Sequence, residues 1–224
     1  MFLYRIFRSP VLLSVVAALA LTACSRGETR VARWPLAVHA GSGKQGDRLG
    51  VLAKGERVEL IAQEGDYAKI RMVDGQEGYV EARHLFLDAI VVSQDAVDLY
   101  RRPSASSGRA PGNSNLDRAD VLFVSDRQEN EEGQWLEVQG GTTNADWIAG
   151  WIKADSGYEN DATLVQDALL LEEAIRKGDR EVLDELAGES SFIGSAAAAA
   201  LQSLEPEPVE KQPAPDDGAG DATN

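Results

Sequence analysis

Hydrophobic and polar residues alternate over short stretches in the middle of the chain, and turn-forming residues separate these stretches. Residues 58–61 and 67–71 are rich in β-branched and aromatic side chains, with a turn at residues 63–66 between them. Asp74-Gly75 predicts a tight hairpin, because glycine tolerates the positive φ of such turns, and residues 78–80 resume a strand. Short strands between closely spaced turns predict a small β-barrel or sandwich rather than a βαβ fold.

The same order of features recurs downstream as an internal repeat. The corresponding stretches are residues 36–39 with 97–100, 52–55 with 116–119, 67–70 with 135–138, and 78–80 with 150–152. The second copy is longer because its loops contain insertions rich in Gly, Ser, Asn and Glu. We therefore predict two copies of one module, at residues 32–86 and 89–156.

Beyond Tyr158 the hydrophobic residues follow helical spacing. Asp161 is a suitable N-cap for a helix ending near Gly178, and Asp179 can begin a second helix, before an alanine-rich stretch at residues 195–204. We expect a helical region over residues 161–204 that either packs on its neighbouring domain or offers a surface to a partner. The final residues 205–224 are rich in proline and acids, and this composition predicts a disordered tail.

The first residues have the pattern of a signal peptide. Arg5 and Arg8 precede an apolar run at residues 11–21 that is too short for a mature transmembrane helix. Leu21-Thr22-Ala23-Cys24 resembles the bacterial lipobox, and this resemblance implies cleavage after residue 23 and lipidation of Cys24. We expect a signal peptide at residues 1–23, a lipid anchor that does not span the membrane, and a polar tether at residues 24–31. Ser25 follows where inner-membrane retention commonly uses aspartate, which favours the outer membrane.

The two β modules resemble the bacterial SH3-like (SH3b) domains. The family pattern has a middle Leu-x-x-Gly motif, then a Trp-x-x-Val motif and a closing Gly-Trp-Val motif. Here these motifs match residues 52–55, 67–70 and 78–80 in the first copy, and 135–138 and 150–152 in the second. The second copy has Ala119 where the family has its central glycine. The resemblance implies a mainly β chain with two small SH3-like barrels in tandem, followed by the short helical region and the tail.

Charge and residue types exclude several function classes. The formal net charge of −15 disfavours nucleic acid as a partner, because phosphate contacts require clustered Lys and Arg. The single cysteine excludes an intramolecular disulfide, and two histidines with one lipidated cysteine cannot form a usual His/Cys zinc site. No motif for nucleotide binding or nucleophilic catalysis is present. The sequence therefore predicts a protein that is not an enzyme, with no catalytic residue, no metal and no cofactor.

Aromatic side chains are the remaining candidates for ligand contact. Those at equivalent repeat positions commonly fill the barrel in the family, whereas Tyr100 and Trp147 lie beside a strand end and an insertion and are candidate ligand-binding residues. The leading hypothesis is an envelope lipoprotein whose modules bind cell-wall peptidoglycan or envelope components. The alternative is a surface-exposed adhesion lipoprotein that binds host or partner proteins.

Overall fold

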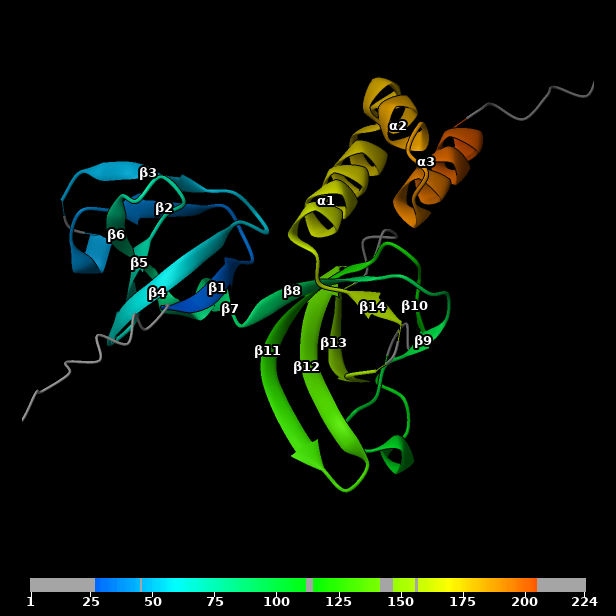
Figure 1. The fold of residues 1–224 in the computed structure, drawn as a ribbon, viewed down its shortest axis with the longest axis horizontal. Coiled ribbons are helices and arrows are strands. Elements are labelled where there is room, and N and C mark those ends of the chain that lie inside the picture. The colour runs from blue at the N-terminus through cyan, green and yellow to red at the C-terminus, as the bar shows by residue number, and fades with distance from the viewer. Residues whose placement is uncertain (1–26, 45, 112–114, 142–146, 156, 205–224) are drawn as a thin grey trace, which may run out of the picture.

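The computed structural model describes residues 27–44, 46–111, 115–141, 147–155 and 157–204 (Figure 1). The first β unit is a seven-stranded antiparallel sheet in the order β3-β2-β6-β5-β4-β1-β7. Its strands are β1 (Glu28–Ala32), β2 (Leu36–His39), β3 (Arg48–Leu52), β4 (Arg57–Glu64), β5 (Tyr67–Arg71), β6 (Glu77–Glu81) and β7 (Leu85–Phe86). The predicted Asp74-Gly75 hairpin lies between β5 and β6, and Gly75 has the positive φ that the turn requires.

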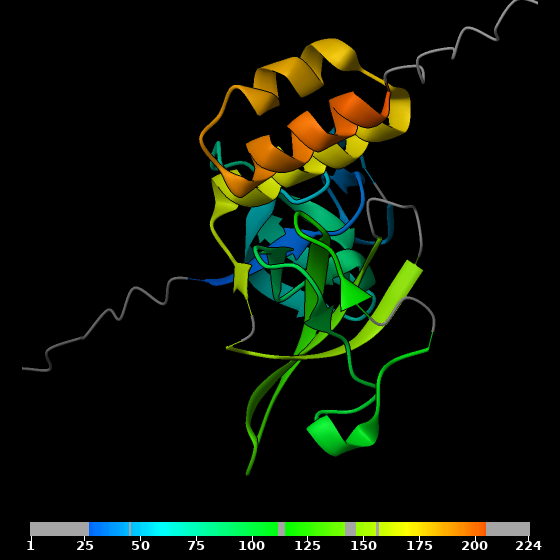
Figure 2. The same cartoon turned by 90° about the vertical axis from the view of Figure 1, so that its right-hand side faces the viewer.

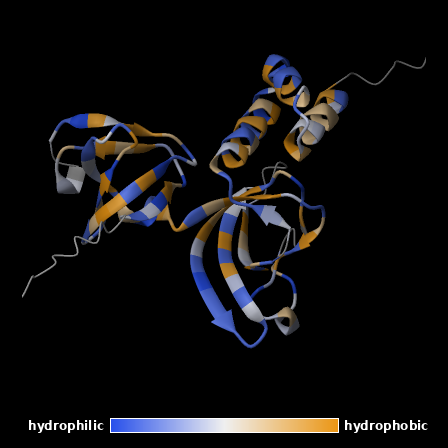
Figure 3. Cartoon of the chain, viewed as in Figure 1, coloured by the Kyte–Doolittle hydropathy of each residue, from blue (hydrophilic) through white to orange (hydrophobic). Residues whose placement is uncertain are grey.

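The second β unit begins two residues later with β8 (Asp88–Val92). Its main sheet has the order β13-β12-β11-β8-β14. Strands β9 and β10 form a separate two-stranded sheet. The remaining strands are β9 (Val97–Asp98), β10 (Asn115–Leu116), β11 (Val121–Asn130), β12 (Gly133–Gly141), β13 (Trp147–Lys153) and β14 (Tyr158–Glu159). Along β12, buried and less buried positions alternate over its second half. Figure 3 shows bands of hydrophobic and hydrophilic residues along the strands of this unit.

Three helices follow the sheets: α1 (Ala162–Lys177), α2 (Arg180–Ala187) and α3 (Phe192–Ser203). The Asp161 carboxylate accepts hydrogen bonds from the backbone N–H groups of Thr163 and Leu164, so it is the N-cap that the sequence predicts. Gly178 ends α1 in the left-handed conformation, and Asp179 caps α2. The prediction of a mainly β chain with a helical C-terminal region is confirmed. The expected disordered tail lies outside the described residues.

One apolar cluster joins both sheets to the helices. It includes Val31 and Phe86 from the first β unit, Phe123 from β11, and Leu171 and Ile193 from the helices. Phe86 and Phe123 meet edge to face across the two units, with ring centroids 5.9 Å apart. Figure 2 shows the helices as a layer against the β units. The helical region therefore packs on its neighbours, which is the first of the two interpretations above.

Within the part of the chain that the structure describes, no helix is long and apolar enough to cross a membrane. Each β unit also has an apolar core of its own. The core of the first unit includes Leu52 and Ile70, and that of the second includes Leu99 and Ile152, all of them fully buried. Each β unit therefore has its own hydrophobic core, and a third hydrophobic cluster lies at the junction of the two units and the helices.

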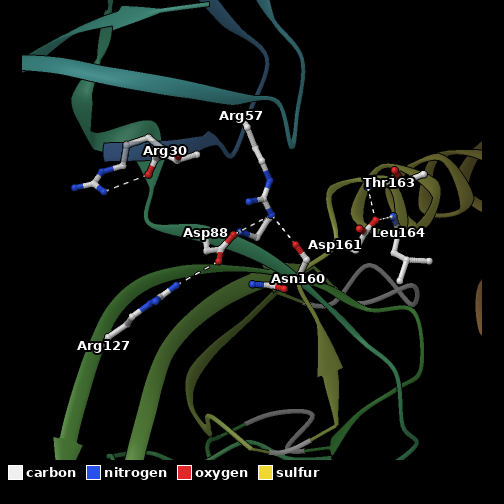
Figure 4. A network of polar contacts seen from close by, with 10 residues as sticks. Arg30, Arg57, Asp88, Arg127, Asn160, Asp161, Thr163 and Leu164 are labelled. Carbon is white, nitrogen blue, oxygen red and sulfur yellow. Dashed lines mark hydrogen bonds and ion pairs between the residues drawn. The ribbon is translucent and has the colours of Figure 1, made fainter. Parts of the chain in front are cut away.

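The Asp88 side chain forms a polar link between the same units (Figure 4). Asp88 is 8% exposed, and its two carboxylate oxygens lie 3.0 Å from Arg57 Nη2 on β4 and 3.2 Å from Arg127 Nη2 on β11. Arg57 also donates to the backbone carbonyl of Asn160, just before α1. One carboxylate thus holds both β units and the start of the helical region in place.

Replacing Asp88 by alanine is expected to lower the free energy of unfolding by about 1.5–3 kcal/mol, because hydrogen bonds to charged groups are lost and Arg57 keeps no acid partner at the junction. Asp155→Ala, at an exposed position, is the matched control and should stay within about 0.5 kcal/mol of wild type. Urea unfolding of both variants provides the measurement. Equal midpoints for the two variants would show that the Asp88 ion pairs contribute no net stability.

Candidate functional site

Two exposed tryptophans from different units lie together at the junction. Trp34 follows β1 and is 43% exposed, and Trp147 begins β13 and is 52% exposed. Their rings are near parallel, with an interplanar angle of 23° and centroids 6.4 Å apart. Large aromatic side chains normally lose most of their exposure on folding. Two that remain open and adjacent mark this position as a candidate binding surface.

The local sequence explains why both rings stay open. Trp34 precedes Pro35 in the bend between β1 and β2, where the chain leaves one strand before entering the next. Trp147 lies opposite Gly141 across the β12–β13 pair, and glycine has no side chain to cover the ring. The next residue on β13, Ile148, points into the core and is 3% exposed. Strand alternation therefore directs Trp147 outward.

Arg33 connects the two rings to both units. Its guanidinium carbon lies 4.0 Å from the Trp147 ring centroid, 5.0 Å from that of Trp34 and 5.2 Å from that of Phe86. Its Nη1 donates a 2.9 Å hydrogen bond to Oε1 of Gln139 on β12. Burial lowers the pKa of Arg33 from its ordinary value. Arginine nevertheless stays protonated in proteins, so the side chain carries a positive charge. The site is thus a cation beside two exposed aromatic faces.

Tyr100, the other predicted ligand-contact residue, has different neighbours. Its ring lies edge-on to buried Trp135, with centroids 5.4 Å apart, and its hydroxyl is 3.4 Å from Asp98 Oδ2. Burial is the main cause that raises the pKa of Tyr100, and the Asp98 carboxylate adds to the effect. Trp147 instead stacks on Trp34. Among the described residues no contact joins Tyr100 to Trp147, so the two predicted residues do not form one site.

Sequence reasoning selected Trp147 but missed Trp34 and Arg33. The Trp34-Pro35 pair directly after a strand was a usable signal, because a proline at a strand boundary favours a bend where a side chain stays exposed. Nothing in the local sequence indicated that Arg33 would reach a residue more than a hundred positions away.

The described residues include no candidate metal centre. No group of three His, Cys, Asp or Glu side chains is arranged to hold a metal ion there. His39 lies on β2, while His84 lies near Glu81 in the turn before β7, at an N–O distance of 3.4 Å. Cys24, the predicted lipidation site, lies outside the described residues. A hollow of about 660 Å³ opens between β4, β5 and Ser125 of β11, with both charged and apolar walls.

Comparison with known protein families identifies the chain. The model of the family described as Lipoprotein LenA matches residues 27–214, which is most of the sequence. The chain belongs to the LenA lipoprotein family. Membership in the LenA family supports the predicted bacterial lipoprotein and indicates a lipid-anchored protein of the cell envelope. No curated protein sequence matches the chain significantly.

Solved structures give only distant similarity to this LenA family member. NlpC2 and NlpC1 of Trichomonas vaginalis are each 14% identical, with TM-scores of 0.24 and 0.27; they match 59% and 68% of this chain and 47% and 52% of their own. An NlpC/P60 endopeptidase from Photobacterium damselae subsp. piscicida is 11% identical, with a TM-score of 0.24, over 65% of this chain and 36% of its own. The chain thus spans about half the length of these proteins or less.

These similarities correct one prediction. The sequence predicts that the protein is not an enzyme, whereas the similar structures include an NlpC/P60 endopeptidase, and this opposes the prediction weakly. We therefore withdraw it. The TM-scores are too low to transfer an activity, so they assign no reaction to the LenA family member either.

Proposed function

We propose that this LenA family protein is anchored in the outer membrane through lipidated Cys24 and binds cell-wall peptidoglycan or another envelope component with its paired β units. The observation that carries the proposal is the exposed Trp34–Trp147 pair at their junction. Flat aromatic faces suit sugar rings, whose axial C–H groups make apolar contacts while their hydroxyls stay in water. A lipid anchor holds such a site near the wall, so weak individual contacts can act together.

We also propose that the two units are tandem SH3-like barrels. Their pairing supports this: β1 pairs with β4 and β7, and β8 pairs with β11 and β14 in the same antiparallel sense. The two glycines of the repeated Gly-aromatic motif support it too. A Cβ on Gly78 would collide with Val38 and the His39 carbonyl, and a Cβ on Gly150 with Leu99 and the Tyr100 carbonyl.

Ala119 adds a further point of agreement between the units. It lies at the repeat position of Gly55, and both have a positive φ, of 72° and 80°. A left-handed backbone is uncommon for alanine, which indicates that the shared turn geometry persists although the residue has changed. The departure from the family pattern at Ala119 is therefore a change of residue and not of backbone path.

Replacing Trp34 or Trp147 by alanine is expected to weaken binding to purified sacculi at least about tenfold, because loss of a central aromatic contact commonly costs about 2 kcal/mol or more. The assay uses the full lipidated chain in a detergent without a sugar headgroup and measures the protein that sediments with sacculi. Val73→Ala is the control, since Val73 is 85% exposed elsewhere. Sedimentation of both tryptophan variants at the wild-type level would contradict the proposed site.

A second candidate function is binding of host or partner proteins at the cell surface. It is favoured by a hollow of about 500 Å³ between β3 and α1 with apolar and charged walls, where Val51 and Leu170 are 47% and 44% exposed. Protease treatment of intact cells tests this alternative directly. Full protection of the protein under conditions that cleave known surface proteins would contradict outward exposure.

A further inference from the structure

Arg33 differs from the other arginines that the structure describes. Every other half-buried arginine there pairs with a carboxylate: Arg30 with Glu28, Arg57 with Asp88, Arg71 with Glu59 and Glu77, and Arg118 with Asp95. Arg33 is half-buried, yet no ion pair joins it to an acid among the described residues. This is unexpected in a chain with 37 acidic residues against 22 basic ones.

The guanidinium of Arg33 has more N–H donors than hydrogen-bond acceptors among the described residues. Arginine has five N–H donors, and among the described residues one hydrogen bond is formed, from Nη1 to Gln139. Its Nε is shielded from solvent and has no hydrogen-bond partner. The three aromatic rings around the cation stabilise its charge but accept no directional hydrogen bond in the plane of the group. Within the described part of the chain, the guanidinium of Arg33 therefore has no carboxylate partner.

We propose that the Arg33–Trp34–Trp147 site binds a sugar ring that bears a carboxylate, with the ring on the tryptophan faces and the carboxylate on the free Nη donors of Arg33. This rests on the proposed function and names the chemistry of its ligand. Arginine matches a carboxylate through two parallel hydrogen bonds.

Two sources supply this chemistry. One is the wall itself, where a muramic-acid sugar has a lactyl carboxylate when its peptide is removed. The other is an acidic polysaccharide built from uronic acids. Both present one carboxylate on a pyranose ring, and both are distinguishable from a neutral amino-sugar chain of similar length.

Titration calorimetry of the full lipidated protein tests the proposal with three probes: a neutral N-acetylglucosamine tetramer, a tetragalacturonate, and a peptide-free disaccharide with the lactyl carboxylate. The wild type is expected to bind at least one acidic probe about tenfold more tightly than the neutral one. Arg33→Gln should remove that difference between the acidic and the neutral probes. Arg48→Gln, at an exposed arginine on β3, should keep it.

The outcomes separate this inference from the proposed function. Equal affinity of the wild type for acidic and neutral probes overturns the role of Arg33 without using any variant, and sacculus binding through the tryptophans can still hold. Tight binding of tetragalacturonate with no sedimentation on sacculi supports the inference and contradicts the wall as the target. An acidic preference that survives Arg33→Gln in a variant with wild-type melting temperature also overturns the inference.

Discussion

Replacing Trp135 by alanine is expected to lower the free energy of unfolding by about 3–5 kcal/mol, the range for removing a fully buried aromatic side chain. Trp135 is 0% exposed and lies on β12 in the middle of the second β unit. Its ring contacts the Tyr100 ring edge-on, and its Nε1 donates a 3.2 Å hydrogen bond to Oδ1 of Asn130. Alanine would leave a cavity and remove both contacts.

Trp147→Ala is the matched control for this experiment, because it makes the same change on the neighbouring strand at a position 52% exposed. It should cost about 1 kcal/mol or less, through loss of its contacts with Trp34 and Arg33. Denaturant unfolding followed by tryptophan fluorescence and far-UV circular dichroism measures both variants. If Trp135→Ala were no more destabilised than Trp147→Ala, the interior of the second unit would not be packed as described.

Local patterns predicted the elements of this chain well where the signal lay within a few residues. The Asp161 and Asp179 caps, the Gly178 stop and the Asp74-Gly75 hairpin depend on neighbouring backbone groups, and the structure contains each of them. The start of β1 was harder to predict. Strand β1 begins at Glu28, within the segment assigned to the tether, and its Arg30 and Glu28 give it a polar appearance.

The candidate site could not be predicted in the same way. Trp34 and Trp147 become neighbours because Phe86 and Phe123 pack together at the junction between the two units. This packing depends on how the surfaces of the two folded units fit, which the hydrophobic periodicity of the sequence does not show. The same closure brings Arg33 to Gln139. An alignment of the two repeats cannot show it, since each repeat contributes one tryptophan at a position that its copy does not share. The lipidation of Cys24 stays a prediction of sequence alone.

Replacing Cys24 by serine is expected to abolish the incorporation of labelled palmitate, and with it the acyl chains that hold the protein in the membrane. Serine has no thiol for the diacylglycerol thioether, and each buried acyl CH₂ contributes about 0.8 kcal/mol to membrane binding. Gly27, three residues after Cys24, donates a 2.9 Å hydrogen bond to the Glu59 carboxylate of β4. Three residue steps span at most about 11 Å, so the anchor would hold the first β unit directly at the membrane surface.

Ser25→Asp is the matched control for Cys24→Ser, because it keeps the cysteine and changes only the residue that follows it. This variant should stay lipidated and membrane-bound, and it should move from the outer to the inner membrane if the sorting rule applies in this bacterium. Fractionation after a high-salt wash, with incorporation of labelled palmitate, measures anchoring and sorting together. Incorporation of labelled palmitate into the Cys24→Ser protein at the wild-type level would contradict a lipid anchor at Cys24.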